Sequence, residues 1–301
     1  AVLADNRMAG PAIGLICDGT GYGADGTIWG CEVLVGDAAD YERAGHLRTI
    51  RLPGGEAAIH EPWRVAAAWL QETFGPGFHE DLAIPFVEDI DLQAWRTLAE
   101  MIERGVNAPL ASSAGRLFDA VAALIGLYHR VEYEAQAPMK LEAVADGNGG
   151  LTPRPPLPDD INDMSQAGEG ANTTVGGGTG PLREADEPMD SPPPTARRGW
   201  AAEAVASRAL NPYAYEVREE DDGLILDPTP TFRAMVEDIA AGAGQSHIAA
   251  RFHATFVAML AEAAEVIAEA LGIDLVALSG GTFQNRIVLE NLMDELERRN
   301  L

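Results

Sequence analysis

The stretch from Ile273 to Arg299 constrains the fold more than any other part of the sequence. It begins with a short apolar run, continues through a loop with two adjacent glycines, Gly280 and Gly281, and ends in a segment with apolar residues at helical spacing. A strand, a glycine turn and a helix in this order are typical of α/β proteins that bring backbone against a nucleotide. The stretch therefore predicts an α/β fold.

A second glycine-rich stretch, Asp18 to Thr27, lies between two apolar runs, 12–17 and 28–35. Glycine tolerates positive φ and lacks a Cβ, so backbone amides of such a loop can approach a phosphate. Glycine-rich turns between strands are also common without any ligand. The stretch predicts either an anion-binding hairpin or an ordinary turn, and the pattern alone leaves both open.

Apolar patterning predicts most of the remaining elements. Three strands joined by short turns are expected as an antiparallel meander, at 12–17, 28–35 and 47–52. Helices are expected at 61–70, 91–102, 112–128, 229–241, 247–271 and 286–299. In the third of these helices, Gly115 and Asp119 are four apart and share a surface. They are equally consistent with a ligand's sugar or phosphate and with a packing glycine beside a solvated acid.

The composition changes abruptly at 146–198, where Pro, Gly, Ser, Thr, Asn and Asp dominate. Such a segment cannot bury enough apolar surface to offset its ordering entropy, so we expect a disordered insertion. Residues 1–145 and 199–301 are then expected to form one folded unit. Because the chain opens at Ala1 without an initiator Met, we also expect it to be a piece of a longer polypeptide.

Charge and cysteine content narrow the setting. The sequence has 47 acids against 21 bases, a formal net charge of −26. An acidic surface of this kind favours a halophilic source, and it disfavours nucleic-acid binding, which needs basic patches. No apolar run is long enough to predict a membrane span. Cys17 and Cys31 lack metal-site spacing, and two free cysteines indicate a cytoplasmic protein.

Seven motifs complete the sequence pattern. They include Asp-Gly-Thr-Gly-Tyr-Gly at 18–23 and Ser-Gly-Gly-Thr-Phe-Gln-Asn at 279–285, and all lie, in order, at 18–30, 51–55, 61–64, 112–121, 134–136, 251–253 and 278–286. Together they resemble the C-terminal region of the hydrogenase-maturation carbamoyltransferases, the HypF family. The resemblance covers nearly everything except about 146–200. It implies an actin-like ATPase architecture of two ribonuclease-H-like lobes. This chain would be the second lobe, with a five-stranded mixed sheet and flanking helices.

The resemblance also implies an activity. Enzymes of this family make carbamoyl-adenylate from ATP in a separate upstream domain and pass the carbamoyl group to the C-terminal cysteine of a partner, HypE. The product becomes a cyanide ligand of nickel–iron hydrogenase. The alternatives are an O-carbamoyltransferase of natural-product biosynthesis and a non-catalytic nucleotide-binding module.

Site residues follow from the matched motifs. The resemblance implies a polar role at the reacting end for Asp18, and nucleotide or phosphate binding by Gly19, Thr20, Gly21, Gly115, Asp119, Gly280, Gly281 and Asn285. It also implies a divalent metal, but the family's histidine pair is expected upstream of Ala1 and its aspartate beyond Leu301. No metal ligand is expected in this chain, and we expect it to be inactive alone.

Overall fold

The computed structural model describes residues 2–8, 10–147, 211–221 and 223–301. The expected insertion at 146–198 therefore lies outside the described residues, except for Asp146 and Gly147. Within the described parts of the chain, no helix is both long and apolar enough to cross a membrane.

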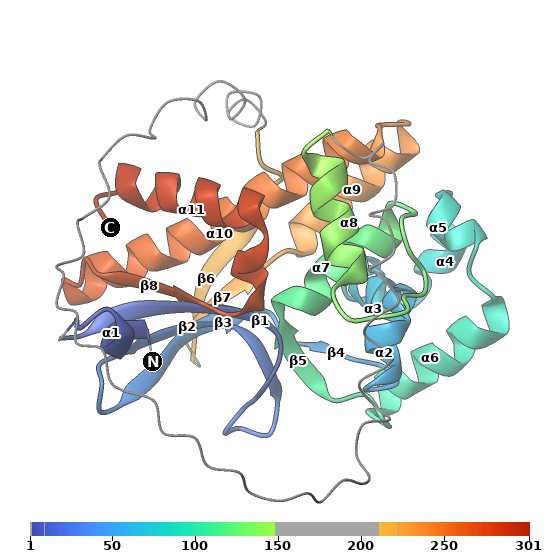
Figure 1. Ribbon diagram of the computed structural model, residues 1–301. Helices are drawn as coiled ribbons and strands as arrows, with labels where there is room; N and C mark the ends of the chain where they lie inside the picture. The colour runs from blue at the N-terminus through green and yellow to red at the C-terminus, as the bar shows by residue number, and fades with distance from the viewer. Residues whose placement is uncertain (1, 9, 148–210, 222) are drawn as a thin grey trace, which may run out of the picture. The chain divides into compact units, whose positions relative to one another are not determined.

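The described residues form one mixed sheet of eight strands (Figure 1). Its centre is β2 (Ile28–Gly36), which pairs along one edge with β1 (Ala12–Tyr22) in antiparallel orientation. The far edge of β1 pairs in parallel with β8 (Val276–Ser279), which comes from the C-terminal part of the chain. The glycine stretch and the last glycine turn are therefore on neighbouring strands.

The other edge of β2 is shared by two strands. The first residues of β2 pair in parallel with β5 (Leu110–Ser113), and the later residues pair antiparallel with β3 (Tyr41–Leu47). The short β4 (Ile50–Arg51) extends the sheet beyond β5. Beyond β3 lie β7 (Gly223–Asp227) and then β6 (Glu216–Glu220).

Two parts of this sheet differ from the sequence expectations. The meander of β1, β2 and β3 is present, but the third strand is 41–47 and not 47–52, because its first half is exposed and charged and lacks an apolar signal. The sheet has eight described strands where five were expected.

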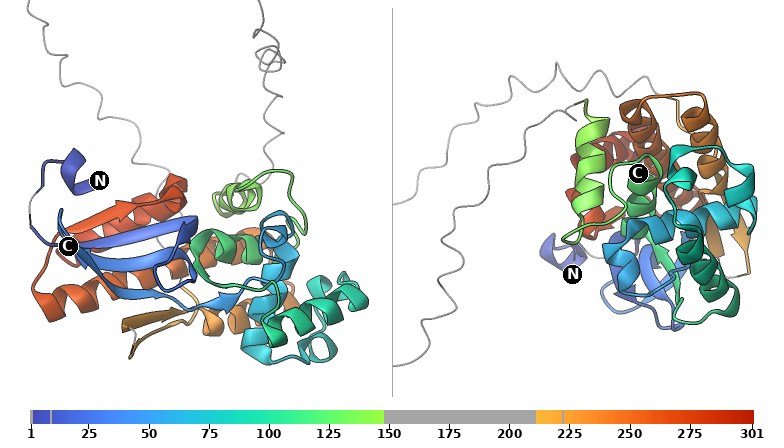
Figure 2. Two further views of the ribbon diagram at one scale, coloured as in Figure 1. Left: turned by 90° about the horizontal axis from the view of Figure 1, so that it is seen from below. Right: turned by 90° about the vertical axis from the view of Figure 1, so that its right-hand side faces the viewer.

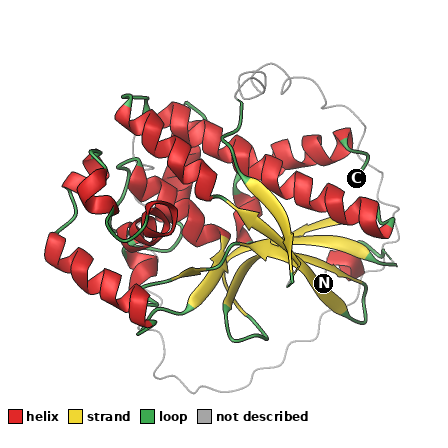
Figure 3. Cartoon of the chain, turned by 180° about the vertical axis from the view of Figure 1, so that it is seen from behind, coloured by secondary structure: helices red, strands yellow, loops and turns green. Residues whose placement is uncertain are grey.

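Seven longer helices flank the sheet: α3 (Pro62–Phe74), α6 (Leu92–Arg104), α7 (Ala114–Leu124), α8 (Gln136–Ala145), α9 (Thr229–Ala240), α10 (Gln245–Leu271) and α11 (Arg286–Arg298). Four single-turn α-helices and one 3₁₀ helix complete the described elements: α1 (Val2–Asp5), α2 (Ala57–His60), α4 (Phe78–Asp81), α5 (Pro85–Glu88) and η3 (Gly281–Gln284). Figures 1 and 2 show α10 and α11 running along the strands, with α2 to α7 gathered beside the sheet; Figure 3 shows the same division from behind. These helices and the mixed sheet agree with the expected fold class.

Aromatic side chains join the helices to one another. The ring of Phe118 on α7 meets Phe252 and Phe256 of α10 edge-on, with centroids 4.9 and 5.1 Å apart. On the other side, Trp69 of α3 stacks on Phe232 of α9 at 5.2 Å. All five rings are buried, so the first contacts hold α7 against α10 and the second holds α3 against α9.

Candidate functional site

Asp18, predicted for the reacting end, and Gly19 and Thr20, predicted for phosphate binding, form a bulge inside β1. The strand continues through them to Tyr22, and the turn proper is 23–27. The ladder register shifts between Cys17 and Gly21, so three residues of β1 face the single Gly30 of β2. A bulge takes residues out of the ladder and re-aims them. Asp18 and Thr20 are exposed as a result.

The bulge is packed against the start of α7 at backbone distance. A Cβ on Gly115 would lie 2.8 Å from Gly19 Cα, and a Cβ on Gly30 would lie 2.9 Å from the Asp18 carbonyl oxygen. Real side chains do not fit at these distances. The Ser113 hydroxyl, which caps α7, donates to the Gly19 carbonyl and accepts from Arg116 N at 3.0 Å. Two predicted residues, Gly19 and Gly115, are therefore in direct contact.

The glycine turn after β8 reaches the same bulge. Gly280 has φ of 108°, and a Cβ there would collide with the Cys17 carbonyl. A Cβ on Gly281 would lie 3.1 Å from Asp18 Oδ1. That carboxylate oxygen also accepts a hydrogen bond of 2.7 Å from Gly19 N. The structure thus brings Asp18, Gly19, Gly280 and Gly281 together, while the amide of Gly19 is engaged by the neighbouring carboxylate.

Asn285 has both ends of its side chain engaged within the protein. Its Oδ1 accepts from Val288 N at 3.1 Å and so caps α11, and its Nδ2 lies 3.0 Å from His253 Nε2. His253 is buried, and burial lowers its pKa to about 4, so the imidazole is neutral. A neutral ring that donates from Nδ1 to the Ala249 carbonyl can accept at Nε2. Asn285 anchors the turn to α10 in this geometry.

Asp119 is 2% exposed and lies deeper than a surface ligand residue. Burial raises the pKa of its carboxyl to about 7; the charge of Arg116 opposes this rise and that of Glu134 adds to it. Arg116 Nε lies 2.7 Å from Asp119 Oδ2. Sequence reasoning assigned no role to Arg116, although it stands between Gly115 and Asp119 in the motif. Its buried Nη1 has no hydrogen-bond partner among the described residues.

Two features of this cluster suit an anion. The first turn of α7 offers a positive helix end, and the unpartnered Nη1 of Arg116 lacks the acceptor that a phosphate supplies. In the described ranges, no three His, Cys, Asp or Glu side chains come close enough together to hold a metal ion. The start of α7 and the Arg116 guanidinium are therefore the features that suit a phosphate group.

The remaining predicted residues lie beside this cluster. Thr20 is exposed at the end of the bulge, and Gly21 resumes the ladder opposite Trp29, where a Cβ would come within 3.0 Å of the Trp29 carbonyl oxygen. A separate hollow of about 210 Å³ is lined mainly by apolar groups of α5, α7, α9 and α10 and by His129. None of the predicted site residues lines that hollow. The candidate site is therefore an open surface built largely from backbone.

The chain is similar to known proteins along most of its length. Residues 14–167 and 197–301 match the family model described as the carbamoyltransferase Kae1-like domain, second subdomain. The whole chain is 35% identical to carbamoyltransferase HypF2 of Cupriavidus necator and covers 32% of that protein. Over 273 residues it is 33% identical to carbamoyltransferase HypF of Rhodobacter capsulatus, covering 90% of this chain and 26% of the relative.

Two solved structures are also similar. The crystal structure of full-length HypF in the phosphate- and nucleotide-bound form has a TM-score of 0.72 and 30% identity, covering 99% of this chain and 30% of that one. The crystal structure of HypF from T. kodakarensis has a TM-score of 0.68, and the match covers 100% of this chain and 32% of that one. Because the two are 24% identical, this similarity supports the fold alone. The chain thus spans about a third of the length of the relatives that it matches along its whole length.

Proposed function

Because the chain belongs to the HypF carbamoyltransferase family, as the second subdomain of its Kae1-like domain, we propose that it forms part of a site that transfers a carbamoyl group from a nucleotide. One observation carries the proposal: the bulge of β1, the start of α7 and the turn after β8 meet at Asp18 and Gly19. Three segments far apart in sequence supply backbone and one buried cation to a single surface. The similarity to a structure of HypF bound to phosphate and nucleotide supports it.

In this proposal the substrate is ATP or carbamoyl-adenylate. The α7 N-terminus and Arg116 bind its phosphate, because a helix N-terminus and an arginine fork are the two favoured partners of that group. The phosphate competes with the Asp18 carboxylate for the amide of Gly19, because Gly19 N donates a hydrogen bond of 2.7 Å to Asp18 Oδ1. Gly280 and Gly281 admit the nucleoside because they present backbone without side chains.

The acceptor in this proposal is the C-terminal cysteine of HypE. Its thiolate sulfur attacks the carbamoyl carbon, a carbon–sulfur bond forms, the bond from that carbon to the phosphate oxygen breaks, and AMP leaves with the electron pair. Arg116 stabilises the charge that builds on the leaving phosphate, and Asp18, which is exposed, orients groups at the reacting end. The HypF names of the relatives favour this acceptor over the hydroxyl of a natural-product enzyme.

We further infer that transfer needs parts beyond this chain. It spans about a third of the length of relatives such as HypF2, and a divalent metal would need ligands from outside the described residues. We also propose that residues 1–145 and 199–301 form one folded unit. The same proposal includes a cytoplasmic location and a halophilic source. A protein that is fully stable and soluble at low ionic strength would contradict the halophilic source.

The test uses the full-length gene product with carbamoyl phosphate, ATP and HypE, and mass spectrometry of the HypE C-terminal peptide. We expect a carbamoyl adduct on the cysteine and none on a Cys→Ala partner. Gly115→Ala is expected to lower the rate at least about tenfold, because its Cβ would meet Gly19 Cα at 2.8 Å.

Gly77→Ala is the matched control. Gly77 has a φ of −88° and open space around its Cβ position, so the same change there leaves the rate unaltered. The wild-type protein failing to modify HypE would refute the activity. If instead Gly115→Ala transferred as fast as Gly77→Ala, the activity would stand but its assignment to this surface would be wrong.

A further inference from the structure

We propose that Arg43, on β3, is a positioning residue that sets the geometry of the bulge at Asp18, Gly19 and Thr20 by fixing the hairpin beyond it. The inference rests on the proposed function, because the positioned group is the candidate nucleotide site. Arg43 lies outside every motif that the sequence pattern singled out.

The hairpin has few bonds of its own with which to hold its direction. Beyond the bulge only Gly21 and Tyr22 pair with β2, opposite Trp29 and Ile28. The turn adds two backbone hydrogen bonds of 3.0 Å, Gly23 N to the Thr27 carbonyl and Gly26 N to the Gly23 carbonyl. A two-stranded ribbon of this length is marginal in isolation. Its angle to the sheet therefore depends on contacts from outside.

Asp25 holds the tip of the hairpin together and forms an ion pair with Arg43. Its Oδ1 accepts from Thr27 N at 2.9 Å, from Thr27 Oγ1 at 2.8 Å and from Trp29 Nε1 at 3.1 Å. Its Oδ2 pairs with Arg43 Nη1 at 3.0 Å. Partial burial works against ionisation, but the bonds from Thr27 and Trp29 and the charge of Arg43 lower the pKa of Asp25 to about 2. Asp25 is thus a permanent anion at neutral pH.

The other side of the same guanidinium is held in the sheet. Arg43 Nη2 donates to Glu32 Oε1 at 3.0 Å and to Ser112 Oγ at 3.3 Å. Glu32 is 2% exposed, and Ser112 donates to the same carboxylate oxygen at 2.5 Å. Ser112 directly precedes Ser113, whose hydroxyl holds the Gly19 carbonyl. Arg43 therefore connects the hairpin tip to the residues that support the bulge.

The Trp29 ring adds a third restraint. The guanidinium carbon lies 4.4 Å from its centroid, and a Cβ on Gly23 would collide with the same ring. A planar fork can bridge two carboxylates and stack on an indole at once, whereas a lysine ammonium cannot do all three. Arginine is thus the residue type that can make all three contacts at position 43.

The bulge is consequently fixed from both sides. The ladder from Ala12 to Cys17 holds it on one side, and the hairpin held by Arg43 holds it on the other. Without Arg43 the hairpin can tilt, and Gly19 and Thr20 move relative to Gly115. Within the sheet, Glu32 loses the Arg43 bond but keeps the hydrogen bond from Ser112. Loss of Arg43 therefore affects ligand geometry more than global stability.

The test compares Arg43→Met and Arg43→Lys in the full-length gene product with Arg48→Met as the matched control. Arg48 follows the same strand and also pairs with two carboxylates, Asp227 and Glu72, but contacts no part of the hairpin. Amide hydrogen exchange of residues 19–27 is measured for each at increasing ATP concentration, and the protection of these residues gives the ATP dissociation constant of this site, separate from the upstream domain that uses ATP. Arg43→Met should speed exchange at 19–27 and raise the ATP dissociation constant, each about tenfold. Arg43→Lys should fall between it and the wild type.

Arg48→Met should change neither readout, although it should lower the urea midpoint at least as much as Arg43→Met. Unchanged exchange at 19–27 in Arg43→Met, or an equal increase in Arg48→Met, would overturn the positioning role. If ATP protected none of these residues in the wild-type protein, the proposed function would fail, and exchange without ATP would still decide whether Arg43 orders the hairpin.

Discussion

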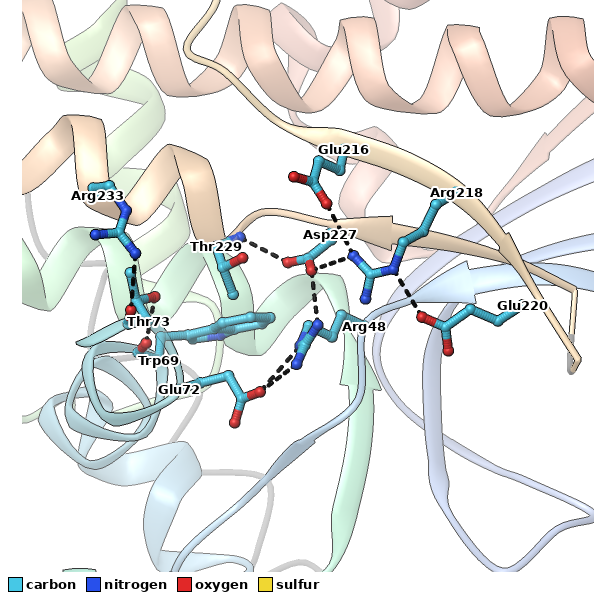
Figure 4. Close-up of polar contacts among 10 residues, drawn as sticks. All are labelled: Arg48, Trp69, Glu72, Thr73, Glu216, Arg218, Glu220, Asp227, Thr229 and Arg233. Carbon is cyan, nitrogen blue, oxygen red and sulfur yellow. Dashed lines mark hydrogen bonds and ion pairs between the residues drawn. The ribbon is translucent and has the colours of Figure 1, made fainter. Parts of the chain in front are cut away.

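Arg43 and Arg48 lie near the two ends of β3 and organise two charged clusters with opposite arrangements. In the first cluster one arginine bridges two acids, Asp25 and Glu32. In the second, one acid, Asp227, is shared by two arginines, Arg48 at 2.8 Å and Arg218 at 2.6 Å (Figure 4). Similar ion pairs can therefore serve different parts of the fold.

The second cluster connects distant parts of the chain. Arg48 also reaches Glu72 of α3, Asp227 Oδ1 accepts from Thr229 N at the start of α9, and Figure 4 shows these groups meeting between the sheet and the helices. Arg233 adds a bond to the Thr73 carbonyl. The first cluster instead fixes one hairpin against its own sheet. We infer that the Arg48 cluster supports global stability and the Arg43 cluster supports local geometry.

The largest expected effect comes from Asp227→Asn. Asp227 is 2% exposed, and removing its charge leaves Arg48 and Arg218 without their shared partner. We expect a loss of about 2 kcal/mol in the free energy of unfolding, because a buried charge pair has lost one side. Urea denaturation measures it, with Asp221→Asn on the exposed turn as control. Equal stability of the two variants would remove the distinction between the clusters.

The contributions of Asp227 and Glu32 to the free energy of unfolding should change with pH in opposite directions. Burial works against ionisation of Asp227, but Arg218 and Thr229 hold its pKa below the usual value of 3.8. Its stabilisation is therefore present above pH 3.8 and is lost as the pH falls through the folded-state pKa. Burial raises the pKa of Glu32 above 4.5, against the opposing bonds from Ser112 and Arg43. Its contribution is complete below pH 4.5 and declines as the pH rises.

Urea titrations between pH 3 and pH 7 measure this contrast. The stability gap between wild type and Asp227→Asn should narrow on acidification. Over the same acidification, the free energy of unfolding of the wild type should rise relative to that of Glu32→Gln. Parallel pH profiles for the two variants would contradict the opposite pKa directions.

At neutral pH, Glu32→Gln is expected to change stability by no more than about 1 kcal/mol. The amide oxygen can still accept from Ser112 and Arg43, and the cost of a buried charge disappears. The same variant should raise the ATP dissociation constant modestly, since Arg43 loses one of its two anionic anchors. A loss of stability as large as that of Asp227→Asn would show that both clusters are structural.

The smallest effect is expected at the rim of the second cluster. Arg218 Nε pairs with Glu220 at 2.8 Å, and these side chains are 35% and 49% exposed. An exposed pair of this kind contributes roughly 0.3 kcal/mol and is screened by salt. Glu220→Gln should therefore be nearly neutral in urea denaturation at moderate salt. A loss of stability close to that of Asp227→Asn would mean that the exposed Arg218–Glu220 pair provides most of the cluster's stabilisation.

The elements that the sequence predicted well are those with a strong local signal. The apolar runs at β1 and β2, the helix expected at 91–102, and the strand, glycine turn and helix at 273–299 all agree with the structure. The bulge could not be predicted, because it exists only in the register between β1 and β2. A glycine-rich sequence without its partner strand is indistinguishable from a loop.

The motifs singled out the residues of the candidate site but did not indicate their environment. Spacing placed Asp119 on a surface, whereas the structure buries it against Arg116. Asn285 bonds with His253, which lies 32 residues earlier, and no local pattern indicates that pair. The partners of Arg43 and Arg48 come from up to 179 residues away. Only the tertiary fold decides such contacts.

The parallel pairing of β1 with β8 has a consequence for the order in which the protein is made. Residues 13–16 leave the ribosome about 260 residues before their partners at 276–279, which at usual synthesis rates is a delay of roughly 13 to 50 s. During that time β1 has one unpaired edge, and such edges recruit foreign strands. Gly280, folded against the Cys17 carbonyl, comes directly after β8. The nascent chain therefore needs protection until its last strand arrives, and the candidate site is complete only when that strand docks.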